Sequence, residues 1–80
     1  MTRNEIKQKV IEICRDIFDD ADLVITEETG ASDIDKWDSL AQLNILGDIE
    51  DEFNVHFSLD ETMSLKTIGE LIITIENKII

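Results

Sequence analysis

The residues Asp38, Ser39 and Leu40 are the part of this sequence whose types and spacing could do chemistry. They close a long connecting segment and open an apolar repeat at helical spacing, so the serine falls at the start of a helix. Backbone N–H groups at a helix start lack internal partners, and the helix dipole places partial positive charge there. A phosphate ester on Ser39 would be stabilised in that field. We expect Asp38 to cap the helix or orient the serine, and Leu40 to face inward.

The same residues have a simpler interpretation. Ser39 also opens a capping pattern, Ser39-x-x-Gln42, in which its hydroxyl would only accept a hydrogen bond from the amide near Gln42. On these local residues alone an ordinary helix cap is the more economical hypothesis. The choice between a modified serine and a cap therefore depends on the rest of the chain.

Four helices are expected to position this segment. Capping patterns begin at Thr2, Ser39, Ser58 and Thr67, and the one at Ser58 precedes only a short segment, 59–63. The sequence therefore predicts an all-α four-helix bundle, with three long helices and one short one, in a single domain spanning residues 1–80. The apolar repeats of the long helices are Ile6, Val10, Ile13, Cys14, Ile17 and Phe18; then Leu43, Ile45, Leu46, Ile49 and Phe53; then Ile68, Leu71, Ile72, Ile75 and Ile79.

The connection between the first two helices, residues 19–37, is longer than most helix-to-helix links. Its composition is not that of a disordered segment, because it contains several large apolar side chains. We expect Gly30 to supply a turn within it. We expect the loop to be ordered and fixed to the core by Leu23, Val24, Ile25, Ile34 and Trp37.

The net charge of −12 is the clearest feature of the composition. It argues against binding of nucleic acid or an anionic membrane, because both need clustered Lys and Arg. It favours protein partners with basic surfaces. No Lys or Arg lies between Lys36 and Lys66, so one strongly negative face is expected from the acids of that stretch, which are Asp38, Asp48, Glu50, Asp51, Glu52, Asp60 and Glu61.

Other residue types indicate neither an enzyme nor a metal protein. The chain has one His and one Cys; His56 lies in a short connector, and Cys14 falls on an apolar helix face. The acids Asp33, Asp35 and Asp38 lack the glycine and closing glutamate of a calcium loop. Residues 1–10 lack the apolar centre of a secretory signal, and no segment has the roughly 20 apolar residues that span a bilayer. We therefore expect a cytoplasmic, non-enzymatic protein.

Over essentially its whole length the chain resembles the acyl carrier protein family. An isolated Asp-Ser-Leu triplet is a weak signal, but it is strong in combination with the length, the acidity and the four helix starts. The residues that carry the resemblance are Asp38-Ser39-Leu40, Leu43, Leu46, Ile49, Glu50-Asp51-Glu52 and Phe53, then Val55-His56-Phe57, and finally the run from Leu65 to Leu71.

The resemblance implies that Ser39 receives 4'-phosphopantetheine from coenzyme A, transferred by a phosphopantetheinyl transferase with magnesium. Asp38 and Leu40 flank that attachment point. The thiol of the arm would carry acyl intermediates as thioesters to acyl-transferring or acyl-activating enzymes, and the carrier itself is expected to be a monomer. The second helix would meet basic patches on those enzymes through Asp48, Glu50 and Asp51, together with Asp38.

The sequence departs from the fatty-acid carriers at three positions of the second helix. Ala41 and Asn44 stand where those carriers usually have acids, and Gly47 stands where they have a bulky apolar residue. These differences favour a specialised pathway over housekeeping fatty-acid synthesis. The alternative function is an unmodified acidic helical module that binds a basic protein, which would have no need of a serine at this helix start.

Overall fold

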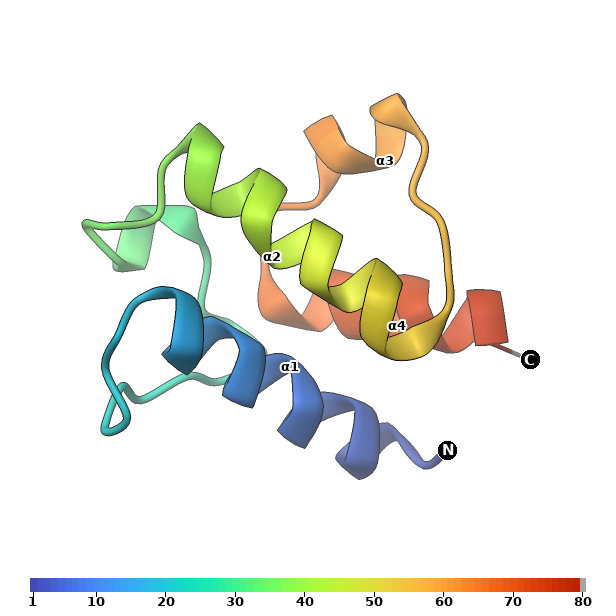
Figure 1. Cartoon of the computed structure of the whole chain (residues 1–80), viewed down its shortest axis with the longest axis horizontal. Helices are drawn as coiled ribbons and strands as arrows, with labels where there is room; N and C mark the ends of the chain where they lie inside the picture. The colour runs from blue at the N-terminus through green and yellow to red at the C-terminus, as the bar shows by residue number, and fades with distance from the viewer. Residues whose placement is uncertain (80) are drawn as a thin grey trace.

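The computed structural model describes residues 1–79, and its helices follow the order expected from the sequence (Figure 1). Three long helices and one short helix are present, as predicted. A single 3-10 turn, η1, lies in the long connection before the second helix. The bounds are α1 Arg3–Ile17, η1 Ala31–Asp33, α2 Ser39–Phe53, α3 Leu59–Ser64 and α4 Ile68–Ile79.

Two of the predicted capping boxes form in full. At the start of α1, the Thr2 hydroxyl accepts from the Glu5 amide (3.2 Å), and the Glu5 carboxylate accepts from the Thr2 amide (2.9 Å). At the start of α3, Ser58 and Glu61 make the same reciprocal pair at 3.1 and 2.9 Å. Four otherwise unpartnered amides are thus satisfied locally, which explains why these starts can be predicted from sequence.

The cap of α4 is formed only in part as predicted. The Thr67 hydroxyl accepts from the Glu70 amide (3.2 Å), but the Glu70 carboxylate accepts from the Lys66 amide (3.4 Å) instead of the Thr67 amide. Another amide at the start of α4 is satisfied by the long loop: the Ile68 amide donates to the backbone carbonyl of Thr29 (2.9 Å). The loop between α1 and α2 therefore completes the start of α4.

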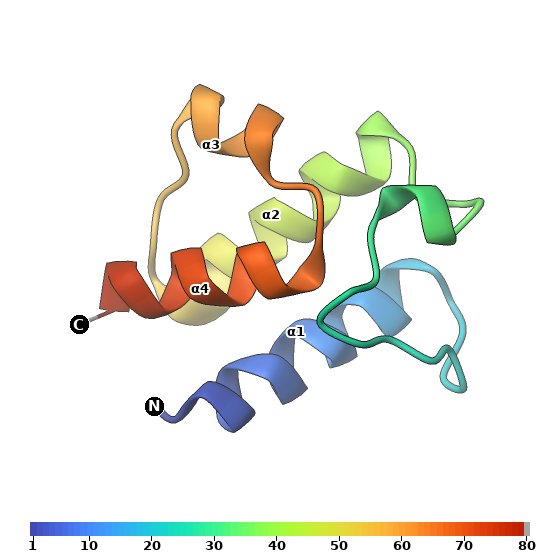
Figure 2. The ribbon, with the colours of Figure 1, turned by 180° about the vertical axis from the view of Figure 1, so that it is seen from behind.

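The core lies where α1 packs against α2 and α4. In both views α3 lies on the side of α2 and α4 away from α1 (Figures 1 and 2). Helix α3 contributes no buried residue, whereas each long helix buries an apolar face. The side chains with no exposed surface are Ile6, Val10 and Cys14 of α1, Ile45 and Ile49 of α2, and Ile68, Ile72 and Ile75 of α4.

The predicted apolar face of α2 is wrong at Leu43, which is 59% exposed. The buried residues of this helix include Ala41, Ile45, Ile49 and Phe53, which recur every four residues. At about 100° per residue, Leu43 falls on the opposite side from Ala41 and Ile45. A second apolar side of α2 thus faces outward.

Most of the predicted anchors of the long loop are confirmed by their burial. Ile25 and Trp37 are buried, and Leu23 and Ile34 pack against the core while half-buried. Val24 is not an anchor, because it is 79% exposed. Its neighbours on both sides turn inward, which leaves Val24 pointing to solvent.

The predicted turn begins at Gly30, whose carbonyl accepts from the Asp33 amide (3.0 Å) at the start of η1, but the missing side chain serves a close approach. Its backbone is extended (φ −134°, ψ −179°) and pairs with Thr67 in an isolated antiparallel bridge. A Cβ at this position would lie 2.5 Å from the carbonyl oxygen of Lys66. Only a residue without a side chain lets the loop reach the chain before α4 so closely.

None of the helices in the described part of the chain is long and apolar enough to cross a membrane.

Candidate functional site

The residue that caps α2 is Asp38, and Ser39 is the first residue of the helix. The Asp38 carboxylate accepts from the Ala41 amide (2.9 Å), and its backbone carbonyl accepts from the Gln42 amide (3.0 Å). The capping interpretation of Ser39 is therefore wrong, whereas the capping role expected of Asp38 is confirmed. Ser39 itself is exposed, and its hydroxyl is not needed to cap the helix because Asp38 does so.

Leu40 does not face inward as predicted, since it is 67% exposed. The inward places around the helix start belong to Trp37 and Ala41, both of which are buried. Leu40 precedes Ala41 by one position and is rotated about 100° away from the buried face. Leu40 and Leu43 therefore place exposed apolar surface beside the serine.

Trp37 holds the loop immediately before the serine. Its ring packs on Phe18 at the end of α1, with the ring centroids 5.8 Å apart. Its indole N–H donates to the side-chain oxygen of Gln42 (2.7 Å), one turn into α2. This confirms Trp37 as a loop anchor, whereas no local sequence pattern indicates the role of Gln42.

An open groove of about 730 Å³ lies against Ser39. Its walls come from three places: the first turns of α2, the loop before them, and α3 with the chain that follows it. Leu59 and Met63 of α3, both 74% exposed, supply much of its apolar surface together with Leu43. The groove residues are Ala31, Ser32, Trp37, Asp38, Ser39, Gln42, Leu43, Leu59, Thr62, Met63, Leu65 and Lys66.

Met63 of α3 lines this groove and is highly exposed. By contrast, the side chains of Leu46, Ile49, Phe57 and Ile68 are buried. The groove therefore lies outside the buried core, next to Ser39.

The three acids predicted to meet partners have different surroundings. Asp48 and Asp51 are exposed on α2, and so is Asp38 at its start. Glu50 is half-buried, because one carboxylate oxygen accepts from the Phe57 amide (2.9 Å) and lies 3.1 Å from Nδ1 of His56. Glu50 therefore fixes the connection between α2 and α3, a role that its place in an acidic run does not reveal.

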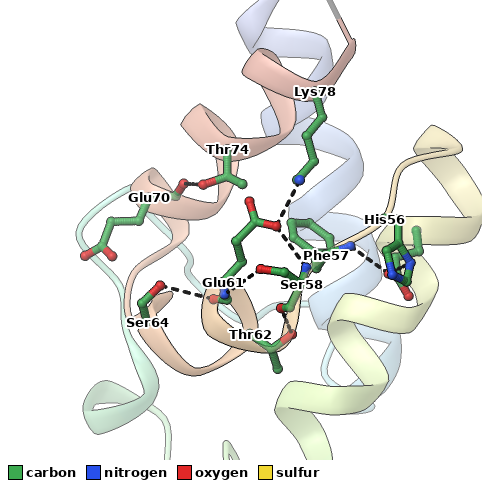
Figure 3. Close-up of polar contacts among 10 residues, drawn as sticks. His56, Phe57, Ser58, Glu61, Thr62, Ser64, Glu70, Thr74 and Lys78 are labelled. Atoms are coloured by element: carbon green, nitrogen blue, oxygen red, sulfur yellow. Dashed lines mark hydrogen bonds and ion pairs between the residues drawn. The ribbon is translucent and has the colours of Figure 1, made fainter.

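A network of polar contacts holds the first turn of α3 (Figure 3). The Glu61 carboxylate lies 3.0 Å from the Lys78 ammonium of α4, and it also accepts from the Ser58 amide. These contacts lower the pKa of Glu61, first through the backbone hydrogen bond from Ser58 and then through Lys78.

The remaining candidates for chemistry are structural. Cys14 is fully buried, and burial raises its pKa to about 12, so the nucleophilic thiolate is suppressed. His56 is an exposed connector residue. Among residues 1–79, no group of three or more His, Cys, Asp or Glu side chains is arranged to hold a metal ion.

The helix start fits a covalently held phosphate ester. The serine hydroxyl is exposed, and Asp38 takes the amides of Ala41 and Gln42. The amides of Ser39 and Leu40 precede the first helical hydrogen bond, so they are the donors left for an anion beside the serine. The open groove next to it leaves room for a flexible chain.

Comparisons with known proteins agree with this geometry. The family model described as the phosphopantetheine attachment site matches residues 8–75. The fold is similar to the solution structure of the holo acyl carrier protein from Geobacter metallireducens, with a TM-score of 0.83 and 37% sequence identity. That match covers 91% of this chain and 84% of the other. A comparison with curated proteins found no match.

The fold and the helix start thus define a carrier domain and not an enzyme. The chain belongs to the phosphopantetheine attachment site family, and its prosthetic group is a covalently attached 4'-phosphopantetheine. Domains of this acyl-carrier type interact with phosphopantetheinyl transferases and with enzymes that handle acyl groups.

Proposed function

We propose that this chain carries acyl intermediates as thioesters on 4'-phosphopantetheine attached to Ser39, and delivers them to partner enzymes. The observation that carries the proposal is that Ser39 is exposed at the first position of α2. Asp38, and not Ser39, caps this helix. A transferase needs an accessible hydroxyl, and a swinging arm needs a rigid base. The fixed loop and the capped helix provide that base.

The partner-facing part of the proposal places Asp48 and Asp51 on α2 against basic patches of the partner enzymes. Both are exposed, and Asp38 extends the same negative charge to the helix start. Glu50 contributes to the field, but its carboxylate is already engaged by the α2–α3 connection. Charge attraction of this kind acts mainly on the association rate.

The proposal favours a specialised pathway over housekeeping fatty-acid synthesis. Ala41 is buried beneath the helix start, so this member packs a small apolar side chain where fatty-acid carriers usually have an acid. Asn44 is exposed and uncharged in the next turn, and no atom outside its own helix lies within 4 Å of where a Cβ on Gly47 would be. On the outer side of α2, Asn44 therefore contributes no negative charge near Ser39, and Gly47 adds no bulk farther along.

The proposal also treats residues 1–80 as one carrier domain that acts as a monomer in the cytoplasm. Its single thiol, Cys14, is buried and takes no part in cross-linking, in keeping with a protein that does not depend on disulfides.

The test is direct modification of the protein. Incubation with coenzyme A, Mg²⁺ and a broad-specificity phosphopantetheinyl transferase is expected to add the mass of one phosphopantetheine, mapped to Ser39. Ser39→Ala should abolish the mass change while the helical fold survives, because Asp38 and not Ser39 caps α2.

Ser32→Ala is the matched control, since Ser32 is another exposed serine that lines the same groove. It should be modified like the wild type. An unmodified wild-type protein, in the presence of a transferase shown to be active on another carrier, would contradict the proposal. The alternative, an unmodified module that binds a basic protein, predicts that result.

A further inference from the structure

The two walls of the groove beside Ser39 are joined by the side chain of Gln42. Its amide oxygen accepts from the indole N–H of Trp37 (2.7 Å), which belongs to the loop wall. Its amide nitrogen donates to the backbone carbonyl of Leu65 (3.4 Å), directly after α3. Both functions of one amide are thus used to span the groove, and we call this pair of hydrogen bonds the Gln42 bridge.

The two ends of the Gln42 bridge differ in the strength of their hydrogen bond and in how well they are packed. The Trp37 end has a short hydrogen bond and a buried ring packed on Phe18. The Leu65 end has a long hydrogen bond and a half-buried side chain. It follows α3, which buries none of its residues and is tied to α4 through the Glu61–Lys78 ion pair (Figure 3). We therefore expect the α3 wall to yield before the loop wall when the groove widens.

Gln42 also lies beside the point where a chain would be attached at Ser39. Residues three apart on a helix lie on the same side, and Ser39 and Gln42 both line the groove. The groove lining also includes the exposed apolar side chains of Leu43, Leu59 and Met63. A groove of about 730 Å³ with such a lining fits an apolar chain of the size of a small organic ligand.

We propose that Gln42 is a specificity-determining residue of this carrier: the Gln42 bridge limits how far the α3 wall can move from the loop wall, and so sets the width of the acyl chain that the groove shelters. The inference rests on the proposed attachment at Ser39 and concerns the same site. The occupant is the apolar acyl chain on the protein's own arm.

Gln42→Glu tests the yielding end alone. A carboxylate keeps the acceptor for Trp37 but sets an oxygen against the Leu65 carbonyl, so only the α3 end is lost. Asn44→Asp is the matched control, because it makes the same change from amide to carboxylate at an exposed position two residues on. Trp37→Phe is the second variant, since it keeps an aromatic ring against Phe18 and removes the donor at the other end, together with part of the buried indole ring.

The first measurement uses the unmodified protein. Backbone amide hydrogen exchange of residues 59–65 is expected to be about five-fold faster in Gln42→Glu and in Trp37→Phe than in Asn44→Asp, as the loss of one hydrogen bond implies. Equal exchange in Gln42→Glu and Asn44→Asp would overturn the bridge. Faster exchange in Gln42→Glu but not in Trp37→Phe would also overturn it, because repulsion by the new carboxylate would then be the cause.

The second measurement uses the loaded protein. Cleavage by hydroxylamine of an octanoyl thioester is compared with that of a wider 4-phenylbutanoyl thioester, each relative to the same thioester on free pantetheine. The wild type and Asn44→Asp should protect the octanoyl chain more, and this preference should shrink in Gln42→Glu. The same preference in all three proteins, or no preference in the wild type, would overturn the inference. A wild type that cannot be loaded at Ser39 would instead contradict the proposed function.

Discussion

At the scale of single residues, two glycines show how different the roles of one residue type can be. Gly30 sits where a Cβ would meet a backbone carbonyl at 2.5 Å, and neither the loop nor the segment before α4 can yield cheaply. Gly47 sits within α2, where a Cβ would meet nothing within 4 Å outside its own helix. Alanine substitutions at these two positions can therefore be compared directly, because the same methyl group is added in a crowded and in an open environment.

Gly30→Ala is expected to lower the free energy of unfolding by about 1–3 kcal/mol, because the added methyl group must push the backbone apart. Gly47→Ala should raise it by up to about 1 kcal/mol, since alanine is the better helix former. Urea denaturation followed by circular dichroism measures both. A Gly30→Ala protein as stable as the wild type would mean that the loop shifts without cost.

The thiol of Cys14 gives a probe of the core. Burial raises its pKa to about 12, so at pH 8 it is almost wholly protonated as well as inaccessible. We expect alkylation by iodoacetamide to be slow in the native protein and to accelerate with urea in step with unfolding. Rapid native-state labelling would show that α1 opens on its own, without global unfolding.

At the scale of the elements, α2 combines two separable tasks in one acidic run. Glu50 holds the α2–α3 connection, whereas Asp48 and Asp51 are exposed. Reversing the charge at Glu50 would therefore confound docking with damage to the fold. The exposed pair gives the cleaner test.

Asp48→Lys and Asp51→Lys should each slow association with a cognate enzyme, and the loss should diminish as salt screens the charges. Glu12→Lys, an exposed site on α1 with the same change of charge, is the control. Association rates measured by stopped-flow fluorescence or surface plasmon resonance test this prediction. If the control slows association as much as the two variants, recognition depends on net charge and not on α2.

The number, order and type of the helices could be predicted because their signals are local. Capping boxes and apolar repeats involve residues within a few positions of one another, as at Thr2 and Ser58. The rotation of α2 was harder to predict, since Leu40 and Leu43 are as apolar as Ala41 and Ile45, and only packing decides which side is buried. The roles of Gly30, Gln42 and Glu50 depend on partners distant in the sequence, so no local pattern indicates them.

At the scale of the whole molecule, the excess of negative charge has the widest effect. Seven basic residues face nineteen acidic ones, and Arg3, Lys7, Lys9 and Lys78 already pair with carboxylates. Most of the acids must therefore repel one another in the folded state. This repulsion opposes the compact form most strongly at low ionic strength.

Raising NaCl from a few millimolar towards physiological ionic strength should raise the thermal midpoint, because the repulsion among acids outweighs the few exposed ion pairs that salt also weakens. Differential scanning calorimetry at fixed pH measures the midpoint. A midpoint that stays flat or falls would mean that the ion pairs contribute more than the repulsion costs.

The contact between the long loop and the start of α4 also bears on how the chain folds. Thr29 and Ile68, joined by a backbone hydrogen bond, lie far apart in the sequence, whereas the caps of α1 and α3 are closed within three residues. Contacts between distant residues require a large loop to close first, which costs entropy before any gain. We therefore expect α1 and α2 to form early in folding, and the contacts of the first turn of α4 with the long loop to form late. In that order, a weakened junction at Gly30 would mainly speed unfolding and leave the folding rate little changed.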